Sequence, residues 1–401
     1  MRRIRELGSP PSSVFRRLPP QASPPPALSP FLRHSQAKAR STPASALPAS
    51  WYFDEETLAL ERRRLFAAAP GYVGHDALVP QEGDYAALDG QYAGEALVRS
   101  ADGVARLVAN VCRHRQAELV TGRGHVKRLV CPMHNWAYDL TGKQVAAPRF
   151  DRLPCLDLAA RPVTRWNNLL FAGPGDPAAE LAAVGKWPEL ADSADYVLAR
   201  VDSEAIDVNW KLFMEVYLED YHVGVVHPGF RNFVDVSELD AEPDFVVGPR
   251  LFAERVGVDW PLPKAGSPAF AEFQRLLVDA SRGDKPPYGA VWLAYFPHML
   301  LEWYPYTFVA STYWPLSPQS TLVQAEYYMD RRIVSERQDL VAATLAMLDE
   351  VTGEDLGVCY ALHRGRSALW RRGAGDPPGP YHEPMEQGLA QFHRWVRNAL
   401  G

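Results

Sequence analysis

Cysteine is scarce in this chain, and long apolar runs are missing from it. Only 4 of the 401 residues are cysteine, which argues against a disulfide framework and favours a reduced compartment such as the cytoplasm. No stretch approaches the roughly 18 consecutive apolar residues that span a bilayer, so we expect no membrane segment. The formal net charge is -6, without a stripe of Lys and Arg over the folded region. Nucleic acid is therefore not an expected partner.

The sequence also lacks a glycine-rich loop for phosphate binding. Residues 122–124 and 173–175 hold isolated glycine pairs, outside the strand-to-helix context that dinucleotide binding requires. We therefore expect the chain to bind no nicotinamide cofactor itself. Electrons from NAD(P)H would reach it only indirectly, through another protein.

The first 48 residues differ in composition from the rest. They are rich in Arg, Ser, Pro and Ala and contain a single acidic residue, Glu6. Such a segment cannot bury a core, so we expect residues 1–48 to be a disordered tail or a non-native extension. The composition is also that of an organelle transit peptide, which would place the protein in a stroma or matrix, although the prolines disfavour the helix of such peptides.

Residues 49–170 predict a small all-β domain preceded by a helix. A helical pattern with acidic residues in its first turn follows Trp51. From Tyr72 to about Arg165, short apolar runs alternate with Gly, Pro and Asp turn signals.

Residues 171–401 predict a sheet with helices around it. Strand-like segments occur at 197–208, 288–315 and 322–331. Helical patterns occur at 210–221, 336–347 and 386–400. The whole chain therefore predicts the α+β fold class with two domains, for which its length and its 47% hydrophobic content suffice.

Two mixed cysteine–histidine pairs dominate the first of these domains. Cys112 and His114 form one pair, and Cys131 and His134 form the other. This ligand set binds a [2Fe-2S] cluster with both cysteines on one iron and both histidines on the other, which raises the cluster's potential for electron transfer. A zinc site is the alternative, but zinc motifs usually pair like ligands with like.

A second metal site is suggested by His222 and His227. On a straight helix of about 3.6 residues per turn, these side chains would point about 140° apart. They converge only if the helix ends or bends, and Gly224 and Pro228 make that break plausible. With a distant carboxylate they would form the 2-His-1-carboxylate site of a non-haem Fe(II) oxygenase. Taken alone the spacing is a weak signal, and two histidines without a metal are the alternative.

The motifs together resemble the α subunits of the Rieske non-haem iron oxygenases. The shared pattern is Cys-x-His-Arg, Cys-Pro-x-His-x-Trp-x-Tyr-x-Leu-x-Gly, Asn-Trp-Lys and Tyr-His-x4-His-Pro, within about residues 50–400. The resemblance implies an all-β Rieske domain and a helix-grip catalytic domain with an antiparallel sheet. Among the family, the chain looks nearest to the choline, carnitine and glycine betaine monooxygenases.

The resemblance also implies the site residues. The cluster ligands are Cys112, His114, Cys131 and His134. The mononuclear iron is bound by His222, His227 and Asp355, with Glu354 as the fallback for the third position and a surface acid pair as the alternative.

Glu219 stands where the family has an acidic residue that connects a cluster histidine of one subunit to an iron histidine of the next. The i, i+3 spacing puts Glu219 and His222 on one helical face. A carboxylate that accepts the second imidazole N–H would fix its tautomer and raise its basicity. A solvated helix face, which suits Asp220, is the alternative.

Several residues depart from the family pattern. Met133 and Asn135 replace the usual Tyr and Gly beside the second cluster pair, and Val216 replaces Asn. Tyr360 and His363 replace Glu and Gln. None of the predicted ligands is lost, but these changes leave the hydrogen bonding of the cluster and the lining of the substrate pocket undecided.

The implied activity is O2-dependent hydroxylation or oxidative demethylation of a small substrate, with electrons from a flavin- or ferredoxin-type reductase. The aromatic residues between 292 and 314 are available to surround a quaternary ammonium cation, although sheet core is the alternative for most of them. The alternative hypotheses are an aromatic-ring hydroxylating dioxygenase and a Rieske electron-transfer protein without oxygenase activity. A homotrimer is expected, whereas the substrate, the reductase and any β subunit are left undecided.

Overall fold

The computed structural model describes residues 40–42, 46–187, 190, 195–241, 244–264, 266–373 and 379–401. The expected tail or transit peptide therefore lies mostly outside the described residues. Within it, β1 (Arg40–Thr42) pairs with β20 (Tyr381–Glu383), and Leu47 is buried in a hydrophobic core. Ordered structure thus begins before residue 48.

The chain from residue 49 to 172 contains one α-helix, several short 3-10 or π-helical turns and three small antiparallel sheets. Helix α1 (Glu55–Glu61) is capped by the Asp54 side chain, which accepts from the amide of Thr57 at 3.0 Å. A five-stranded sheet has the order β10-β5-β4-β3-β6: Ala160–Pro162, Ala105–Ala109, Glu95–Arg99, Asp84–Ala87 and Arg123–His125. A three-stranded sheet is formed by β7 (Leu129–Val130), β8 (Ala137–Tyr138) and β9 (Gln144–Ala146). Another is formed by β11 (Thr164–Trp166), β12 (Leu169–Ala172) and β2 (Gly71–His75).

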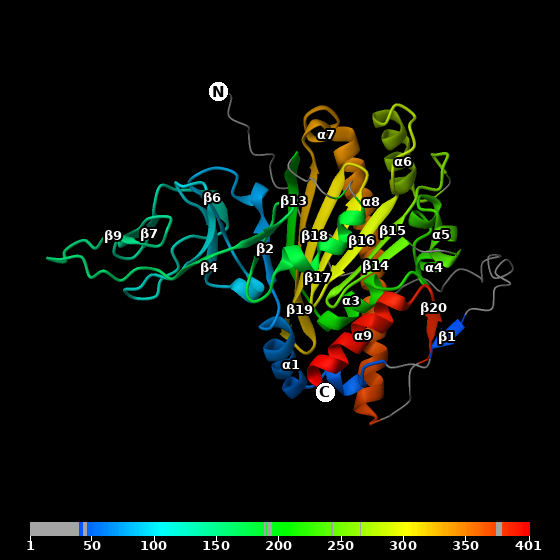
Figure 1. Cartoon of the computed structure of the whole chain (residues 1–401), viewed down its shortest axis with the longest axis horizontal. Helices are drawn as coiled ribbons and strands as arrows, with labels where there is room; N and C mark the ends of the chain where they lie inside the picture. The colour runs from blue at the N-terminus through cyan, green and yellow to red at the C-terminus, as the bar shows by residue number, and fades with distance from the viewer. Residues whose placement is uncertain are drawn as a thin grey trace.

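The rest of the chain builds a seven-stranded antiparallel sheet. Its order is β13-β19-β18-β17-β16-β15-β14: Tyr196–Ile206, Ser320–Asp330, Thr307–Ser317, Met299–Tyr304, Ala290–Tyr295, Leu251–Val256 and Asp244–Val247. The helices are α2 (Pro177–Glu180), α3 (Trp210–Tyr217), α4 (Val223–Val226), α5 (Val236–Ala241), α6 (Pro268–Ala280), α7 (Arg331–Glu336), α8 (Gln338–Arg371) and α9 (Gln387–Leu400). The predicted α+β fold class is confirmed, and Figure 1 shows the small sheets on one side of β13 and the large sheet on the other.

The two faces of the large sheet pack against different partners. Alternation along β17 sends Leu301 and Trp303 into a core shared with Leu169 and Phe171 of β12. The opposite face packs against α8, α6 and α3, where Tyr304 joins a second core. The pocket described below lies on this second face.

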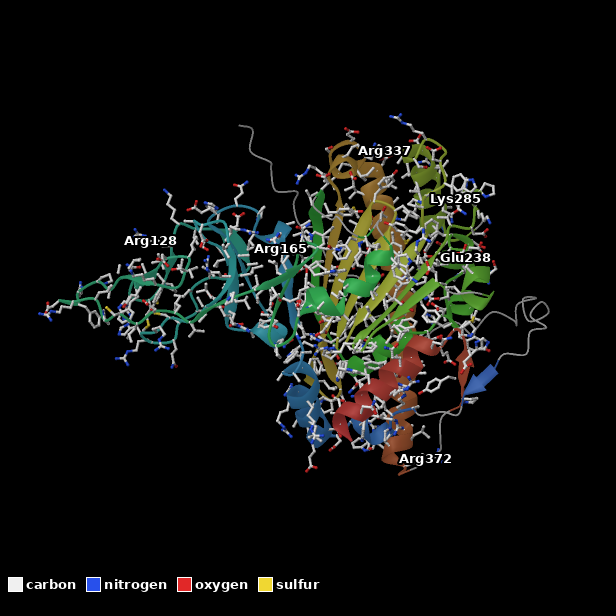
Figure 2. The ribbon with its side chains drawn as sticks, in the orientation of Figure 1. Arg128, Arg165, Glu238, Lys285, Arg337 and Arg372 are labelled. Atoms are coloured by element: carbon white, nitrogen blue, oxygen red, sulfur yellow. The ribbon has the colours of Figure 1, made fainter. Side chains whose placement is uncertain are left out.

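The surface of the molecule carries its charges on many different elements. Charged side chains labelled in Figure 2 are Arg128, Arg165, Glu238, Lys285, Arg337 and Arg372. Among the described residues, no helix is both long enough and apolar enough to cross a membrane.

Candidate metal centres and substrate pocket

Two loops with matching backbone geometry carry the predicted cluster residues. In each, the cysteine N–H donates to the carbonyl oxygen five residues later at 2.8 Å, and the cysteine carbonyl accepts from the N–H four residues later at 3.0 Å. Those fourth residues, Gln116 and Asn135, have positive φ angles of 62° and 59°. Asparagine tolerates this left-handed conformation better than most residues. This explains how Asn135 can stand where the family pattern has glycine.

The loops bring the four predicted cluster ligands together. Cys112 and Cys131 are buried, whereas His114 and His134 lie outside them with their Nδ1 atoms 3.2 Å apart. Burial opposes ionisation of the Cys112 thiol, but hydrogen bonds from the backbone, Tyr138 and Cys131 lower its pKa. The thiolate is the form that binds iron. Two inner thiols and two outer imidazoles therefore fit a [2Fe-2S] cluster with one iron on each kind of ligand.

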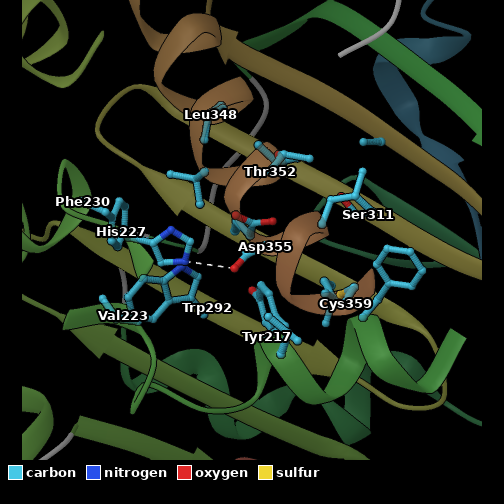
Figure 3. A pocket seen from close by; sticks show the side chains of 18 of the residues that line it. Tyr217, Val223, His227, Phe230, Trp292, Ser311, Leu348, Thr352, Asp355 and Cys359 are labelled. Carbon is cyan, nitrogen blue, oxygen red and sulfur yellow. Dashed lines mark ion pairs between the residues drawn. The ribbon is translucent and has the colours of Figure 1, made fainter. Parts of the chain in front are cut away.

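A second group of side chains that could bind a metal is formed by His222, His227 and Asp355. The two Nε2 atoms are 3.2 Å apart, and Asp355 Oδ1 lies 3.3 Å from His222 Nε2 and 3.0 Å from His227 Nε2. Figure 3 shows the contact between His227 and Asp355. A metal with bonds of about 2.1 Å at right angles separates its ligands by about 3.0 Å. Asp355 Oδ1 is buried and makes no hydrogen bond. These three side chains thus fit the 2-His-1-carboxylate set of a non-haem Fe(II) site.

The helix break that brings the two histidines together lies earlier than the sequence predicts. Helix α3 ends at Tyr217, and His222 and His227 are the caps of the one-turn helix α4. Gly224 lies inside α4, so it is not the point at which the helix breaks. The two imidazoles therefore converge from the ends of a short helix rather than from both sides of a kink.

Each histidine of this group also contacts a glutamate through its other ring nitrogen. His222 Nδ1 lies 2.6 Å from Glu219 Oε1, and His227 Nδ1 lies 2.7 Å from Glu354 Oε2. With Nδ1–H as the donor, each Nε2 keeps its lone pair for a metal. Burial opposes protonation, but the nearby carboxylates of Asp355 and Glu219 raise the pKa of His222 to about 10. Three carboxylates around two imidazoles leave negative charge that a divalent cation would neutralise.

A pocket beside these ligands lies between the large sheet and α8. Its aromatic wall includes Phe213, Tyr217, Phe230, Trp292, Tyr313 and Tyr327, several of which are visible in Figure 3. Of the aromatic residues that the sequence offers as lining, Trp292, Tyr304 and Tyr313 line this pocket. Others, such as Tyr295 and Trp303, belong to the core on the opposite face of the sheet.

Sequence reasoning did not single out Glu302 of the pocket, and it did not assign the contact that Glu354 makes. Glu302 is the only charged residue among the sheet residues that line the pocket. The sequence signal for Glu302 was a single acidic residue within a strand segment that is otherwise apolar and aromatic. Glu354, the predicted fallback ligand, lies at His227 Nδ1, on the other side of the imidazole from Asp355.

Comparisons with known proteins agree with this arrangement. Residues 71–157 match the family model described as the Rieske [2Fe-2S] domain, and residues 187–401 match the ring hydroxylating alpha subunit (catalytic domain). Putrescine 2-hydroxylase of Ralstonia nicotianae is 41% identical over 354 residues, which are 88% of this chain and 95% of that protein. The oxygenase subunit of glycine betaine monooxygenase of Chromohalobacter salexigens is 26% identical over 388 residues, 88% of this chain and 86% of that one.

Solved structures share the fold. The quaternary ammonium Rieske monooxygenase CntA in complex with an inhibitor has a TM-score of 0.72 at 18% identity, over 90% of this chain and 96% of that one. Naphthalene 1,2-dioxygenase from Rhodococcus sp. has a TM-score of 0.66 at 18% identity, over 88% and 94% of the two chains. With a matched Rieske domain, a matched catalytic domain and a relative 41% identical over most of both chains, this protein belongs to the ring-hydroxylating α subunits of the Rieske non-haem iron oxygenases, which carry a [2Fe-2S] cluster and a mononuclear iron and hydroxylate small substrates.

Proposed function

We propose that this oxygenase hydroxylates a carbon atom of a small aliphatic amine, at an iron bound by His222, His227 and Asp355. The observation that carries the proposal is the pocket, which joins these three ligands to an aromatic wall and a single carboxylate from the sheet, Glu302. The relatives named putrescine 2-hydroxylase, at 41% identity, support an amine. When bound, the iron would supply open coordination positions for O2, and the cluster would supply electrons one at a time.

The protein's own part would be to hold the metal face open, to orient the substrate and to keep water away from it. Glu219 and Glu354 hold the imidazoles through Nδ1, which leaves Nε2 free as a ligand atom. Leu348 and Val351 of α8 and Val309 of β18 close the pocket with apolar side chains. Such a wall lowers the local dielectric and strengthens polar contacts inside.

The electron path would run between subunits. Within one chain, the cluster loops lie next to β7 and β9, at the end of the molecule opposite α4 (Figure 1). A homotrimer would bring the cluster of one subunit to the iron site of the next, with Glu219 as the connection to His222. A flavin- or ferredoxin-type reductase would supply the electrons from NAD(P)H.

A quaternary ammonium substrate is the second candidate. The aromatic wall favours it, because the faces of several rings can surround a cation that has no N–H group. Relatives at 23–26% identity include glycine betaine, choline and carnitine monooxygenases. The aromatic-ring dioxygenase hypothesis is supported by the description of the matched family model and by the likeness in fold to naphthalene 1,2-dioxygenase. The match of residues 187–401 to the catalytic domain argues against an electron-transfer protein without oxygenase activity.

The test is substrate-dependent O2 uptake by the anaerobically purified protein with a reductase, using putrescine, glycine betaine, carnitine, choline and aromatic acids. The product would be identified by mass spectrometry with 18O2. Uptake with putrescine and one labelled oxygen atom in the product would support the amine hydroxylase. Formaldehyde release from a betaine would favour the second candidate, and a labelled diol from a ring would contradict both.

A further inference from the structure

The side chain of Glu302 enters the substrate pocket from the middle of the large sheet. β17 lies between β16 and β18, and Glu302 is opposite Trp292 on one side and Val309 on the other. All three line the pocket, as does Tyr304, the next residue on this face of the strand. The carboxylate is thus presented by a central strand, whose backbone is fixed by both neighbours.

Among the described residues, this carboxylate receives one hydrogen bond and has no cationic partner. The Tyr304 hydroxyl donates to Glu302 Oε2 at 2.6 Å, and Trp292 Nε1 lies 3.4 Å from the Tyr304 oxygen. In the described part of the chain, no Lys or Arg side chain is paired with Glu302. Burying an ionised carboxylate without a counter-charge is costly. The group therefore needs a proton or a cation, and the open pocket can admit the cation.

Another glutamate on the same sheet shows what a purely structural carboxylate looks like here. Glu326 of β19 accepts from both Tyr72 and Tyr328 at 2.6 Å. It lines a separate cavity between the large sheet and the strands of the first domain. Its partners tie two parts of the chain together, whereas the partner of Glu302 is its neighbour on the same strand. Glu302 therefore has no comparable role in joining elements.

We propose that Glu302, oriented by Tyr304, binds a primary ammonium group of the substrate and thereby selects aliphatic amines that carry N–H groups. An ammonium group has three donors and can approach a carboxylate to about 2.8 Å. A trimethylammonium group has no donor, and its methyl groups keep the charge away from the oxygens. The carboxylate would therefore favour the first over the second, whereas the aromatic wall accepts either. This inference rests on the proposed amine hydroxylation and names the substrate class of that same pocket.

The direct test is binding to the anaerobic holoenzyme by isothermal titration calorimetry. The probes are putrescine, butylamine and butyltrimethylammonium. Glu302→Gln keeps the size of the side chain and removes its charge, so putrescine and butylamine should bind about 10–100-fold more weakly, as when a charged hydrogen bond is lost. Butyltrimethylammonium should lose much less. Glu326→Gln, the matched control, should leave all three affinities unchanged.

Two further variants keep the test decisive. Glu302→Asp retains the charge with a shorter reach and should recover part of the affinity for butylamine. Tyr304→Phe removes only the orienting hydroxyl and should weaken binding of both amines a few-fold. Iron and sulfide content, with the optical spectrum, would show that each variant is folded and loaded. If Glu302→Gln does not load, the Asp and Phe variants decide, and unchanged amine affinity in both would overturn the proposal.

The failure of this inference can be told apart from the failure of the proposed function. If the wild type hydroxylates putrescine while Glu302→Gln binds it with unchanged affinity, Glu302 is not the ammonium partner although the amine hydroxylation stands. If the wild type neither binds nor hydroxylates any primary amine, the amine assignment itself is wrong. A wild type that binds butyltrimethylammonium more tightly than butylamine would overturn the selectivity.

Discussion

Glu354 and His227 are joined by a hydrogen-bonding contact of 2.7 Å between Oε2 and Nδ1. The next residue on α8, Asp355, lies 3.0 Å from the opposite ring nitrogen of the same histidine. Two consecutive residues of one helix thus contact both nitrogens of one imidazole. Helix α8 therefore places one carboxylate at each nitrogen of this imidazole, which would fix its tautomer and orientation for a metal.

The Glu354→Ala variant should bind the mononuclear iron more weakly. Loss of a carboxylate that orients a metal-binding histidine typically costs about 10–100-fold in metal affinity. Iron retention would be measured by competition with a chelator, with acid-labile sulfide as the control for the cluster. Glu350→Gln, one turn earlier on α8, should behave as the wild type. Equal retention in Glu354→Ala and wild type would show that the contact does not support the metal.

Asp355→Ala should lose the mononuclear iron completely while keeping the cluster. Its Oδ1 atom contacts both Nε2 atoms, and no other carboxylate of the described residues reaches that point. Metal analysis should show one iron fewer per chain, with unchanged sulfide and an unchanged cluster spectrum. Retention of all the iron would mean that these three residues are not the ligand set.

The sequence could predict that each mixed pair lies in one tight loop, because the geometry of such a loop is local. In each loop the predicted ligands are two or three residues apart, and the backbone hydrogen bonds span four or five residues. The α+β class was equally accessible, since strand alternation and helical periodicity are short-range signals. The convergence of His222 and His227 followed from the same kind of argument.

The position of the helix break was not accessible, because distant residues determine it. The amide of Asp220 donates to the Met385 carbonyl at 2.9 Å, and the amide of Leu389 donates to the Leu218 carbonyl at 2.8 Å. The segment after α3 is therefore held by residues more than 160 positions later in the chain. No periodicity in residues 210–228 can reveal such a contact.

Helix α8 is also much longer than the helix that the hydrophobic pattern of the sequence predicts. The pattern predicts a helix over 336–347, but α8 continues to Arg371 through Gly353, Gly357 and Gly365. Glycine lowers intrinsic helix propensity by about 1 kcal/mol per residue. Packing of Leu356 and Cys359 into the core beneath α3 compensates for this. Tertiary contacts thus outweigh the low helix propensity of these glycines. The position of Glu302 in the pocket also depends on distant residues, because it is set by the pairing of the strands in the large sheet.

The Glu219→Gln variant should keep both metals and lose coupled turnover. Glu219 accepts from the backbone N–H and approaches Nδ1 of His222, at 3.1 and 2.6 Å. A neutral amide would weaken the link to this imidazole, and activity should fall about 10–100-fold. Stopped-flow oxidation of the pre-reduced cluster, with O2 and substrate present, would measure the step directly.

The exposed Glu336→Gln should serve as the matched control for this variant. Loss of the mononuclear iron in Glu219→Gln would instead give Glu219 a role in metal binding. Unchanged cluster oxidation, with unchanged coupling of O2 uptake to product, would remove Glu219 from the electron path.

The affinity for a primary amine should fall as the pH drops through about 7. Burial is the main cause that raises the pKa of Glu302 to about 7. The hydrogen bond from Tyr304 acts in the opposite direction, and the negative charge of Asp355 raises the pKa as burial does. Above that pKa the carboxylate is charged and attracts an ammonium group, and below it the carboxyl is neutral. The tyrosines that face it from α3 and β18, Tyr217 and Tyr313, stay neutral because burial raises their pKa well above 10.

Calorimetry at pH 6, 7 and 8 would measure this dependence with butylamine as the probe. One pH unit below the pKa, about nine tenths of the carboxyl is protonated, so affinity should approach a tenfold loss per unit. A metal on Asp355 would offset part of its charge and move the midpoint somewhat lower. Glu302→Gln should show weak, pH-independent binding over the same range, because the amine itself stays protonated there. A wild-type affinity that is constant from pH 8 to 6 would contradict a Glu302 pKa near 7 in the holoenzyme.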